Sequence, residues 1–186
     1  MTKQKNIIWQ YNEFQQVGTD YTSTAEVEIY DSRHSDFRDM EAECIQIIDT
    51  LQIKKSDTLI DFGSGTGTFA IQAAKRCLNV HAVDVSQVMI DYAKAKAVEA
   101  GVSNIRFHHA GFLTYEHNDK PADTITTTFA FHHLPDLWKG IALKRLNSML
   151  KPGGQLYLHD VIVDDENAIE NIATLIDKLA SVGGKR

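Results

Sequence analysis

A hydrophobic run that ends in three alternating glycines constrains this chain more than any other feature. Residues 59–67 read LIDFGSGTG, so a short apolar strand carrying Asp61 runs directly into Gly63, Gly65 and Gly67. Glycine lets the backbone pass close to a ligand, and a helix start supplies unpaired N–H groups beside it. A helical pattern begins at Thr68. The sequence therefore predicts a strand–turn–helix unit that holds a ligand at its turn.

The same turn could in principle bind a dinucleotide. That fingerprint, G-x-G-x-x-G, needs its third glycine at the position where this chain has Thr68. The carboxylate of Asp61 also disfavours a pyrophosphate and suits a cationic or hydroxyl-bearing group. An NAD-type oxidoreductase is therefore the weaker alternative.

A second acid follows one helix later. Residues 79–84 (NVHAVD) form a short apolar strand that ends at Asp84, 21 residues after Gly63. An acid at the end of the second strand of a βαβ unit can accept hydrogen bonds from ribose hydroxyls. The two motifs together are far more specific than a lone glycine-rich turn.

These motifs resemble those of the class I S-adenosylmethionine (SAM)-dependent methyltransferases. Residues 123–136 (DTITTTFAFHHLPD) resemble the family's fourth-strand motif, and residues 150–158 (LKPGGQLYL) resemble the start of its fifth strand. The resemblance covers residues 40–165 and is nearest to small-molecule enzymes of the ubiquinone-biosynthesis type. It implies SAM as the cofactor and methyl transfer to a small-molecule acceptor.

Strands and helices alternate along the chain, which predicts an α/β fold with a doubly wound, mostly parallel, Rossmann-like sheet. Ser86 suits a helix N-cap, Gly101 a helix stop, and residues 152–154 a turn. The expected strands are residues 58–62, 80–84, 105–108, 124–129 and 155–161, and the expected helices are residues 36–51, 68–77, 86–100, 136–150 and 166–180.

The two ends of the chain differ from this core. Residues 1–35 are polar with scattered aromatic side chains and are expected to form a lead-in or lid, whereas residues 36–186 form the SAM-binding domain. The resembled family continues with two more strands. A sheet that stops at residues 155–161 would leave an apolar edge, so we expect the natural chain to extend past Arg186.

Composition restricts the partners and the compartment. A chain of 186 residues with 43% hydrophobic content can bury a sizeable single core. The net charge of −6, without a block of like charge, argues against nucleic acid or an anionic membrane as the main partner. Cys44 and Cys77 lack metal-ligand spacing, so we expect buried thiols, a cytoplasmic protein and no metal site. The oligomeric state is left open.

The resemblance implies cofactor contacts position by position. Asp61 would lie near the ammonium group of SAM, and Asp84 would hold the ribose. Gly111 stands where the family commonly has an acid that reaches the adenine amino group, so backbone or water is expected there, with the N–H of Phe112 meeting a ring nitrogen. Val85 and Met89 could sandwich adenine, although helical core positions explain Met89 equally well. The expected cofactor contacts are Asp61, Gly63, Ser64, Gly65, Gly67, Asp84, Val85, Met89, Gly111, Phe112, Thr128 and Arg38, the last toward the cofactor carboxylate.

Three histidines follow the fourth and fifth expected strands. His132, His133 and His159 are the candidate catalytic residues, because a pKa near neutrality suits removal of a proton from an acceptor. Methyl transfer from a sulfonium depends mainly on positioning, so we favour a role in shaping the acceptor pocket. A non-catalytic cofactor-binding or regulatory module is the other alternative, and the scaffold does not specify the acceptor atom.

Overall fold

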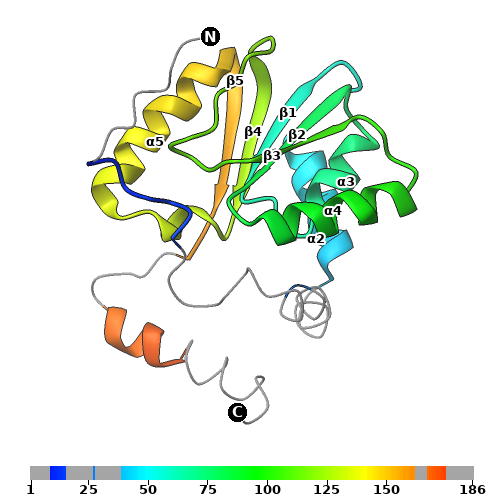
Figure 1. The fold of residues 1–186 in the computed structure, drawn as a ribbon. Coiled ribbons are helices and arrows are strands. Elements are labelled where there is room, and N and C mark those ends of the chain that lie inside the picture. The colour runs from blue at the N-terminus through cyan, green and yellow to red at the C-terminus, as the bar shows by residue number, and fades with distance from the viewer. Residues whose placement is uncertain (1–8, 16–26, 28–38, 162–166, 175–186) are drawn as a thin grey trace.

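The computed structural model describes residues 9–15, 27, 39–161 and 167–174. Five strands form one sheet in the order β3-β2-β1-β4-β5, and every pair is parallel (Figure 1). The strand order reverses between β1 and β4, which is where doubly wound sheets bind ligands. The strands are β1 (Thr58–Phe62), β2 (Asn79–Asp84), β3 (Ile105–His109), β4 (Ala122–Thr128) and β5 (Leu150–His159); the helices are α2 (Met40–Thr50), α3 (Thr68–Ala74), α4 (Gln87–Glu99), the 3₁₀ turn η1 (Phe131–His133) and α5 (Asp136–Met149). The predicted α/β, doubly wound fold is confirmed.

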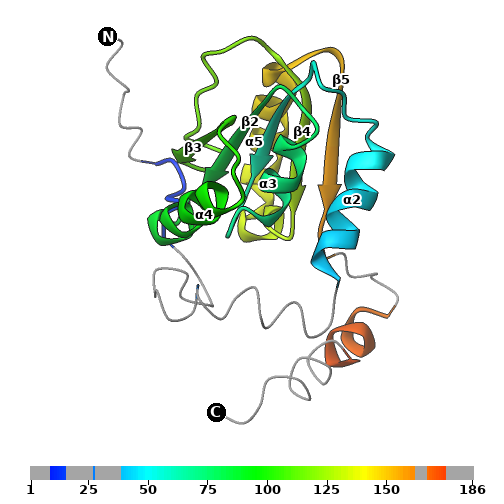
Figure 2. The same cartoon turned by 90° about the vertical axis from the view of Figure 1, so that its right-hand side faces the viewer.

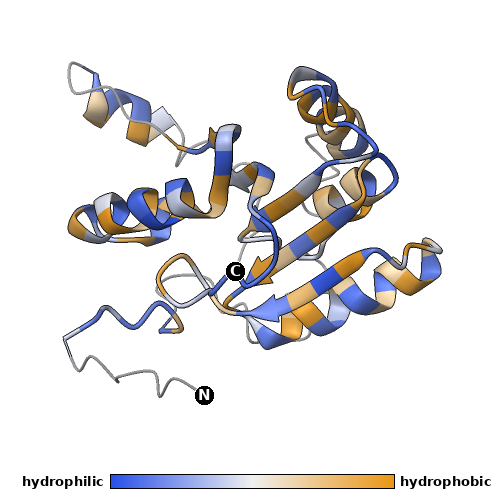
Figure 3. Cartoon of the chain, turned by 90° about the horizontal axis from the view of Figure 1, so that it is seen from above, coloured by the Kyte–Doolittle hydropathy of each residue, from blue (hydrophilic) through white to orange (hydrophobic). Residues whose placement is uncertain are grey.

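The helices cover both faces of the sheet. Figures 1 and 2 show α2, α3 and α4 on one face and α5 on the other. Side chains of β1 alternate between the two cores: Leu59 packs with residues of α2 and α3, whereas Ile60 and Phe62 pack with residues of α5. This alternation follows from strand geometry, since successive side chains point to opposite faces. In Figure 3, the helices that flank the sheet each carry both hydrophobic and hydrophilic residues.

The helix boundaries follow local capping chemistry. The hydroxyl of Ser86 accepts a hydrogen bond from the N–H of Met89 at 3.2 Å, so the predicted N-cap of α4 is confirmed. Gly101, at φ +67°, follows the end of that helix as predicted. Helix α2 begins at Met40 because Asp39 caps it through the N–H of Ala42. Positions 36–38 of the expected helix lie outside the described residues.

The fifth strand begins earlier than the sequence predicts. Strand β5 starts at Leu150, which pairs with Ala122, and regular pairing resumes where Thr124 meets Gln155. The intervening residues form an irregularity around Gly153, whose φ is +78°. The predicted turn at 152–154 is therefore a bulge within the strand, which adds residues to one side of the pair.

Strand β5 lies at one edge of the sheet as described. The amide of Gln155 donates to the carbonyl of Leu51, which ties this edge to the end of α2 at 3.2 Å. Leu156 and Leu158 remain 37% and 38% exposed. The expected extension beyond Arg186 stays a prediction. Of the last expected helix, residues 168–174 are helical, and its remaining positions lie largely outside the described residues.

Both cysteines, Cys44 and Cys77, are buried and free. Across the described ranges, no helix combines the length and hydropathy needed to cross a membrane. The same part of the chain contains no cluster of three or more metal-ligating side chains.

A carboxylate at the start of β4 joins three strands. Asp123 accepts the backbone N–H of Thr58 at 2.8 Å and pairs with the ammonium of Lys151, which connects β1, β4 and the irregular part of β5.

We expect Asp123→Ala to lower the free energy of unfolding by about 1–3 kcal/mol, because a β1 N–H loses its acceptor. Urea denaturation measures this. Asp91→Ala, which removes an exposed carboxylate paired with Lys94, is the control and should leave the free energy of unfolding nearly unchanged. Equal losses in the two variants would contradict the role of Asp123.

Candidate functional site

A cavity opens at the carboxyl ends of the central strands. It encloses about 950 Å³ of empty space, a volume that includes the open solvent at its mouth. The glycine turn, the ends of β2, β3 and β4, the η1 turn and the N-terminal segment 9–15 contribute its walls. The lining residues are Tyr11, Glu13, Gln15, Gly63, Gly65, Asp84, Val85, Met89, Ala110, Gly111, Phe112, Thr128, Phe129, Ala130, His133 and Leu134.

The glycine turn, residues 63–67, forms part of the cavity wall through Gly63 and Gly65. Gly63 has φ +68°, and a Cβ placed on it would lie 2.2 Å from the Cβ of Ala130. Gly65 has φ +51° and lines the cavity, and a Cβ there would meet nothing within 4 Å. Gly63 is therefore required by packing, whereas Gly65 keeps backbone exposed to the cavity.

Asp84 holds the turn in place. One oxygen of its carboxylate accepts the N–H of Gly65 and the other accepts the N–H of Ser86, both at 2.8 Å. The residue is 8% exposed, and burial raises the pKa of its carboxyl group against the effect of these hydrogen bonds. A carboxylate offers about four lone-pair sites, so Asp84 can still accept hydrogen bonds from a ligand in the cavity.

Three of the expected cofactor contacts lie outside the cavity lining. Asp61 is buried, and its carboxylate accepts the hydroxyl of Thr126 at 2.7 Å. Burial raises the pKa of Asp61 to about 7, opposed by the Thr126 hydrogen bond and reinforced by the charge of Asp84. The buried hydroxyl of Ser64 has no hydrogen-bond partner within the described part of the chain. Gly67 precedes α3 and packs against Ala93.

The remaining walls are mostly apolar. Met89 and Phe112 are 3% and 7% exposed, and the ring of Phe112 stacks on that of Phe62 at 5.1 Å between centroids. Phe129 has φ +53°, a conformation that non-glycine residues seldom adopt, and its N–H donates to the carbonyl of His159. Strain of this kind is often found where a chain shapes a ligand site.

The three candidate histidines do not share one surface. His133 lines the cavity, and burial, followed by the charge of neighbouring His132, lowers its pKa, so the ring is neutral near pH 7. His132 instead places Nδ1 2.6 Å from the carboxylate of Asp160. His159 packs against the ring of Phe129 at 4.7 Å. The expectation that all three wall the pocket is corrected, because the η1 turn and Phe129 direct two of them elsewhere.

The N-terminal segment 9–15 supplies wall residues that the sequence did not single out. Tyr11, Glu13 and Gln15 line the cavity, and Glu13 is 8% exposed. The one signal in the sequence was the missing acid at Gly111, which left a polar position unfilled. Arg38 and the lid expected around positions 30–38 lie outside the described residues. Sequence reasoning also missed Ala110, Phe129, Ala130 and Leu134.

Comparison with known proteins identifies relatives of this chain. Residues 59–154 match the model of a family described as a methyltransferase domain. An uncharacterized methyltransferase of Geobacillus kaustophilus, GK2543, is 32% identical over 142 residues, which cover 76% of this chain and 63% of that protein. The chain thus spans less than two thirds of the length of this relative.

Solved structures share the fold. The YcgJ protein from Bacillus subtilis superposes with a TM-score of 0.64 at 25% identity, covering 73% of this chain and 57% of that chain. A complex of DhpI with SAM and HEP superposes with a TM-score of 0.65 at 23% identity, covering 82% and 67% respectively.

The contrast between Gly63 and Gly65 generates a prediction. Gly65→Ala should lower the free energy of unfolding by about 1–2 kcal/mol, the cost of a left-handed conformation for an L-residue. Gly63→Ala should cost roughly 1–3 kcal/mol more, because its Cβ also overlaps Ala130. Denaturant unfolding of both variants measures the difference. Equal costs would show that the contact with Ala130 is relieved by a small shift of the turn.

Proposed function

This chain belongs to the methyltransferase domain family, and from that membership we propose that it binds SAM in the cavity and methylates a small molecule. The observation that carries the proposal is the pairing of Gly65 with Asp84: exposed backbone and a buried carboxylate meet at one cavity wall. The first suits close approach of the methionine portion, and the second suits ribose hydroxyls. The SAM complex of DhpI, which has this fold, supports the assignment.

The residues present fit such a ligand. The space beside Gly65 is open, the hydroxyl of Ser64 is buried with no partner among the described residues, and Val85 and Met89 provide apolar surface for a base. Asp61 would favour the ammonium group of the ligand, because a nearby cation stabilises its ionised form. These features together match a ligand that carries a cation, a ribose and a flat ring. They give no comparable support to NAD.

Bound SAM supplies an electrophilic methyl group on a sulfonium, so the task left to the chain is positioning. Holding two reactants in a productive geometry can contribute roughly 7–11 kcal/mol to catalysis. His133 lines the cavity with a neutral ring, which suits a wall that orients the acceptor. We propose that it shapes the acceptor site. Catalytic roles for His132 and His159 are less well supported, since neither lines the cavity.

The partner and the compartment are part of the proposal. The net charge of −6 and the mostly apolar lining of the cavity favour a small-molecule acceptor over nucleic acid. The buried free thiols of Cys44 and Cys77 fit a reducing, cytoplasmic setting. We further propose that positions 1–35 contribute a lid, of which segment 9–15 is the part described in contact with the cavity.

Calorimetry tests the cofactor assignment. We expect SAM to bind and NAD not to bind, and Asp84→Ala to weaken SAM binding by at least about 100-fold, because two ribose hydroxyls lose a charged acceptor worth about 1.5–3 kcal/mol each. Asp91→Ala, on the exposed face of α4, is the control and should leave affinity unchanged. Unchanged SAM affinity in a folded Asp84→Ala protein would overturn the assignment.

Steady-state kinetics on a panel of oxygen, nitrogen and sulfur acceptors tests His133. If the side chain shapes the pocket, His133→Gln should raise KM for the acceptor and leave kcat within a few-fold of the parent. His132→Gln is the matched comparison outside the cavity and should raise KM less. A loss of kcat of roughly 10²–10⁴-fold, with turnover rising with pH through a pKa below 6.5, would instead assign His133 as a general base.

A further inference from the structure

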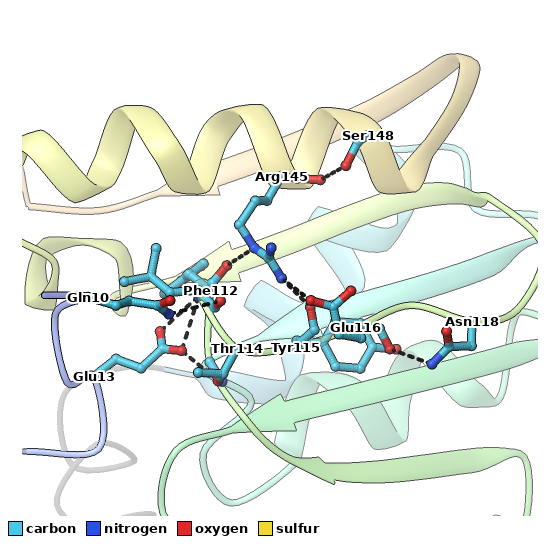
Figure 4. Close-up of polar contacts among 11 residues, drawn as sticks. Gln10, Glu13, Phe112, Thr114, Tyr115, Glu116, Asn118, Arg145 and Ser148 are labelled. Carbon is cyan, nitrogen blue, oxygen red and sulfur yellow. Dashed lines mark hydrogen bonds and ion pairs between the residues drawn. The ribbon is translucent and has the colours of Figure 1, made fainter. Parts of the chain in front are cut away.

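The N-terminal segment 9–15 docks on the loop that follows β3, residues 110–121. Figure 4 shows the side chain of Glu13 pointing from this segment toward that loop. Its carboxylate accepts the N–H of Leu113, at 3.0 and 3.1 Å from its two oxygens, and the hydroxyl of Thr114 at 2.6 Å. The amide of Gln10 donates to the carbonyl of Leu113 at 3.3 Å. The segment is thus fastened to the loop by polar contacts at two points.

Glu13 occupies space that another side chain would normally fill. A Cβ built on Gly111 would lie 2.4 Å from one carboxylate oxygen of Glu13, 2.5 Å from its Cδ and 2.7 Å from Cγ1 of Val85. Gly111 does not have the left-handed φ of the turn glycines, so its backbone conformation would accept another residue. Position 111 is therefore a glycine because a larger side chain would collide with its neighbours. The space that such a side chain would fill holds the carboxylate of Glu13, which lies about 100 residues earlier in the sequence.

A backbone donor lies next to this acceptor. The N–H of Phe112 has no acceptor among the described residues, and the residue lines the cavity with Glu13. The carbonyl of Phe112 accepts a hydrogen bond from Nε of Arg145 at 3.1 Å, and Arg145 also bonds the carbonyl of Tyr115 at 2.7 Å (Figure 4). Helix α5 therefore fixes the loop that presents this donor.

The neighbouring acceptor and donor discriminate between purines. Val85, Met89 and Phe112 add apolar residues to the lining, which suit the faces of a flat heterocycle. Adenine presents an N6–H donor beside the N1 acceptor. Hypoxanthine presents the opposite pattern, a carbonyl beside an N1–H. A site built around a specific hydrogen-bond pattern rejects analogues that leave its buried groups unpaired.

We propose that Glu13 determines specificity for the adenine base, its carboxylate accepting the N6–H while the N–H of Phe112 donates to N1. The proposal rests on the SAM site proposed above and adds the residue that recognises the adenine base. It also gives segment 9–15 a second role, because the residue that anchors the segment to the loop contacts the ligand. Ligand binding and docking of the segment are then coupled through one carboxylate.

Paired ligands test this proposal. Calorimetry compares S-adenosylhomocysteine with its inosine analogue, S-inosylhomocysteine, which differs only in the base. The unaltered protein should prefer the adenine compound by at least about tenfold. Glu13→Gln places an amide where a carboxylate stood, so the preference should fall below about threefold. Glu99→Gln, a matched change at the exposed end of α4 and outside the cavity lining, should keep the full preference.

A rescue variant separates recognition from a purely structural role. Glu13→Ala combined with Gly111→Asp and Val85→Ala puts a carboxylate into the vacated space from the other side and should restore the preference for adenine. Val85→Ala is included because Cγ1 of Val85 would lie 2.7 Å from the new Cβ, and Glu13→Ala with Val85→Ala is the control that should not restore the preference. Gly111→Asp alone should lower thermal stability, because its Cβ overlaps Glu13. Retained preference in folded Glu13→Gln, or no rescue in a folded triple variant, would overturn the role of Glu13. Binding of neither compound by the unaltered protein would overturn this role and the SAM site together.

Discussion

The carboxylate of Asp84 is the contact on which the cavity depends. It accepts the N–H of Gly65 from the turn and the N–H of Ser86 at the start of α4, so one side chain sets the distance between two backbone segments. The carbonyl of Val83, one residue earlier, accepts the N–H groups of both Gly63 and Ser64. The end of β2 therefore positions the whole turn. Because Asp84 is buried, losing either partner would leave an unpaired polar group away from water.

The sequence predicted the elements whose boundaries depend on neighbouring residues. Ser86 and Gly101 mark the two ends of α4 through local hydrogen bonding and a left-handed φ, and both are visible as residue types. The alternation of short apolar runs with helical patterns predicted the parallel sheet. The glycine turn was equally readable, since few residues other than glycine accept φ values such as that of Gly65.

The parts that could not be predicted depend on contacts between distant positions. Glu13 and Leu113 are 100 residues apart in the sequence. Gly111 indicated that the acid common at this position is absent, but it did not indicate which residue takes its place. His132 and His133 are adjacent in the η1 turn, yet only His133 lines the cavity. The sequence contains no clear signal for this short turn, so it could not show which of the two side chains would face the cavity. The bulge at the start of β5 likewise depends on its register with β4. In each of these three cases the local sequence allows several conformations, and contacts with distant residues determine which one forms.

Two buried acids, Asp61 and Asp84, determine the electrostatics near the glycine turn. Burial, together with the smaller effect of the Asp84 charge, raises the pKa of Asp61 to about 7, so ionising both acids costs free energy. An acid whose pKa is raised on folding binds protons more readily folded than unfolded, so its contribution to stability declines as the pH rises from 3.8 toward 7. A ligand that brings an ammonium group and hydroxyl donors offsets this cost, whereas an anionic ligand increases it. Two buried acids beside one glycine turn therefore favour a ligand that carries a cation, and the proposal assigns recognition of its base to Glu13.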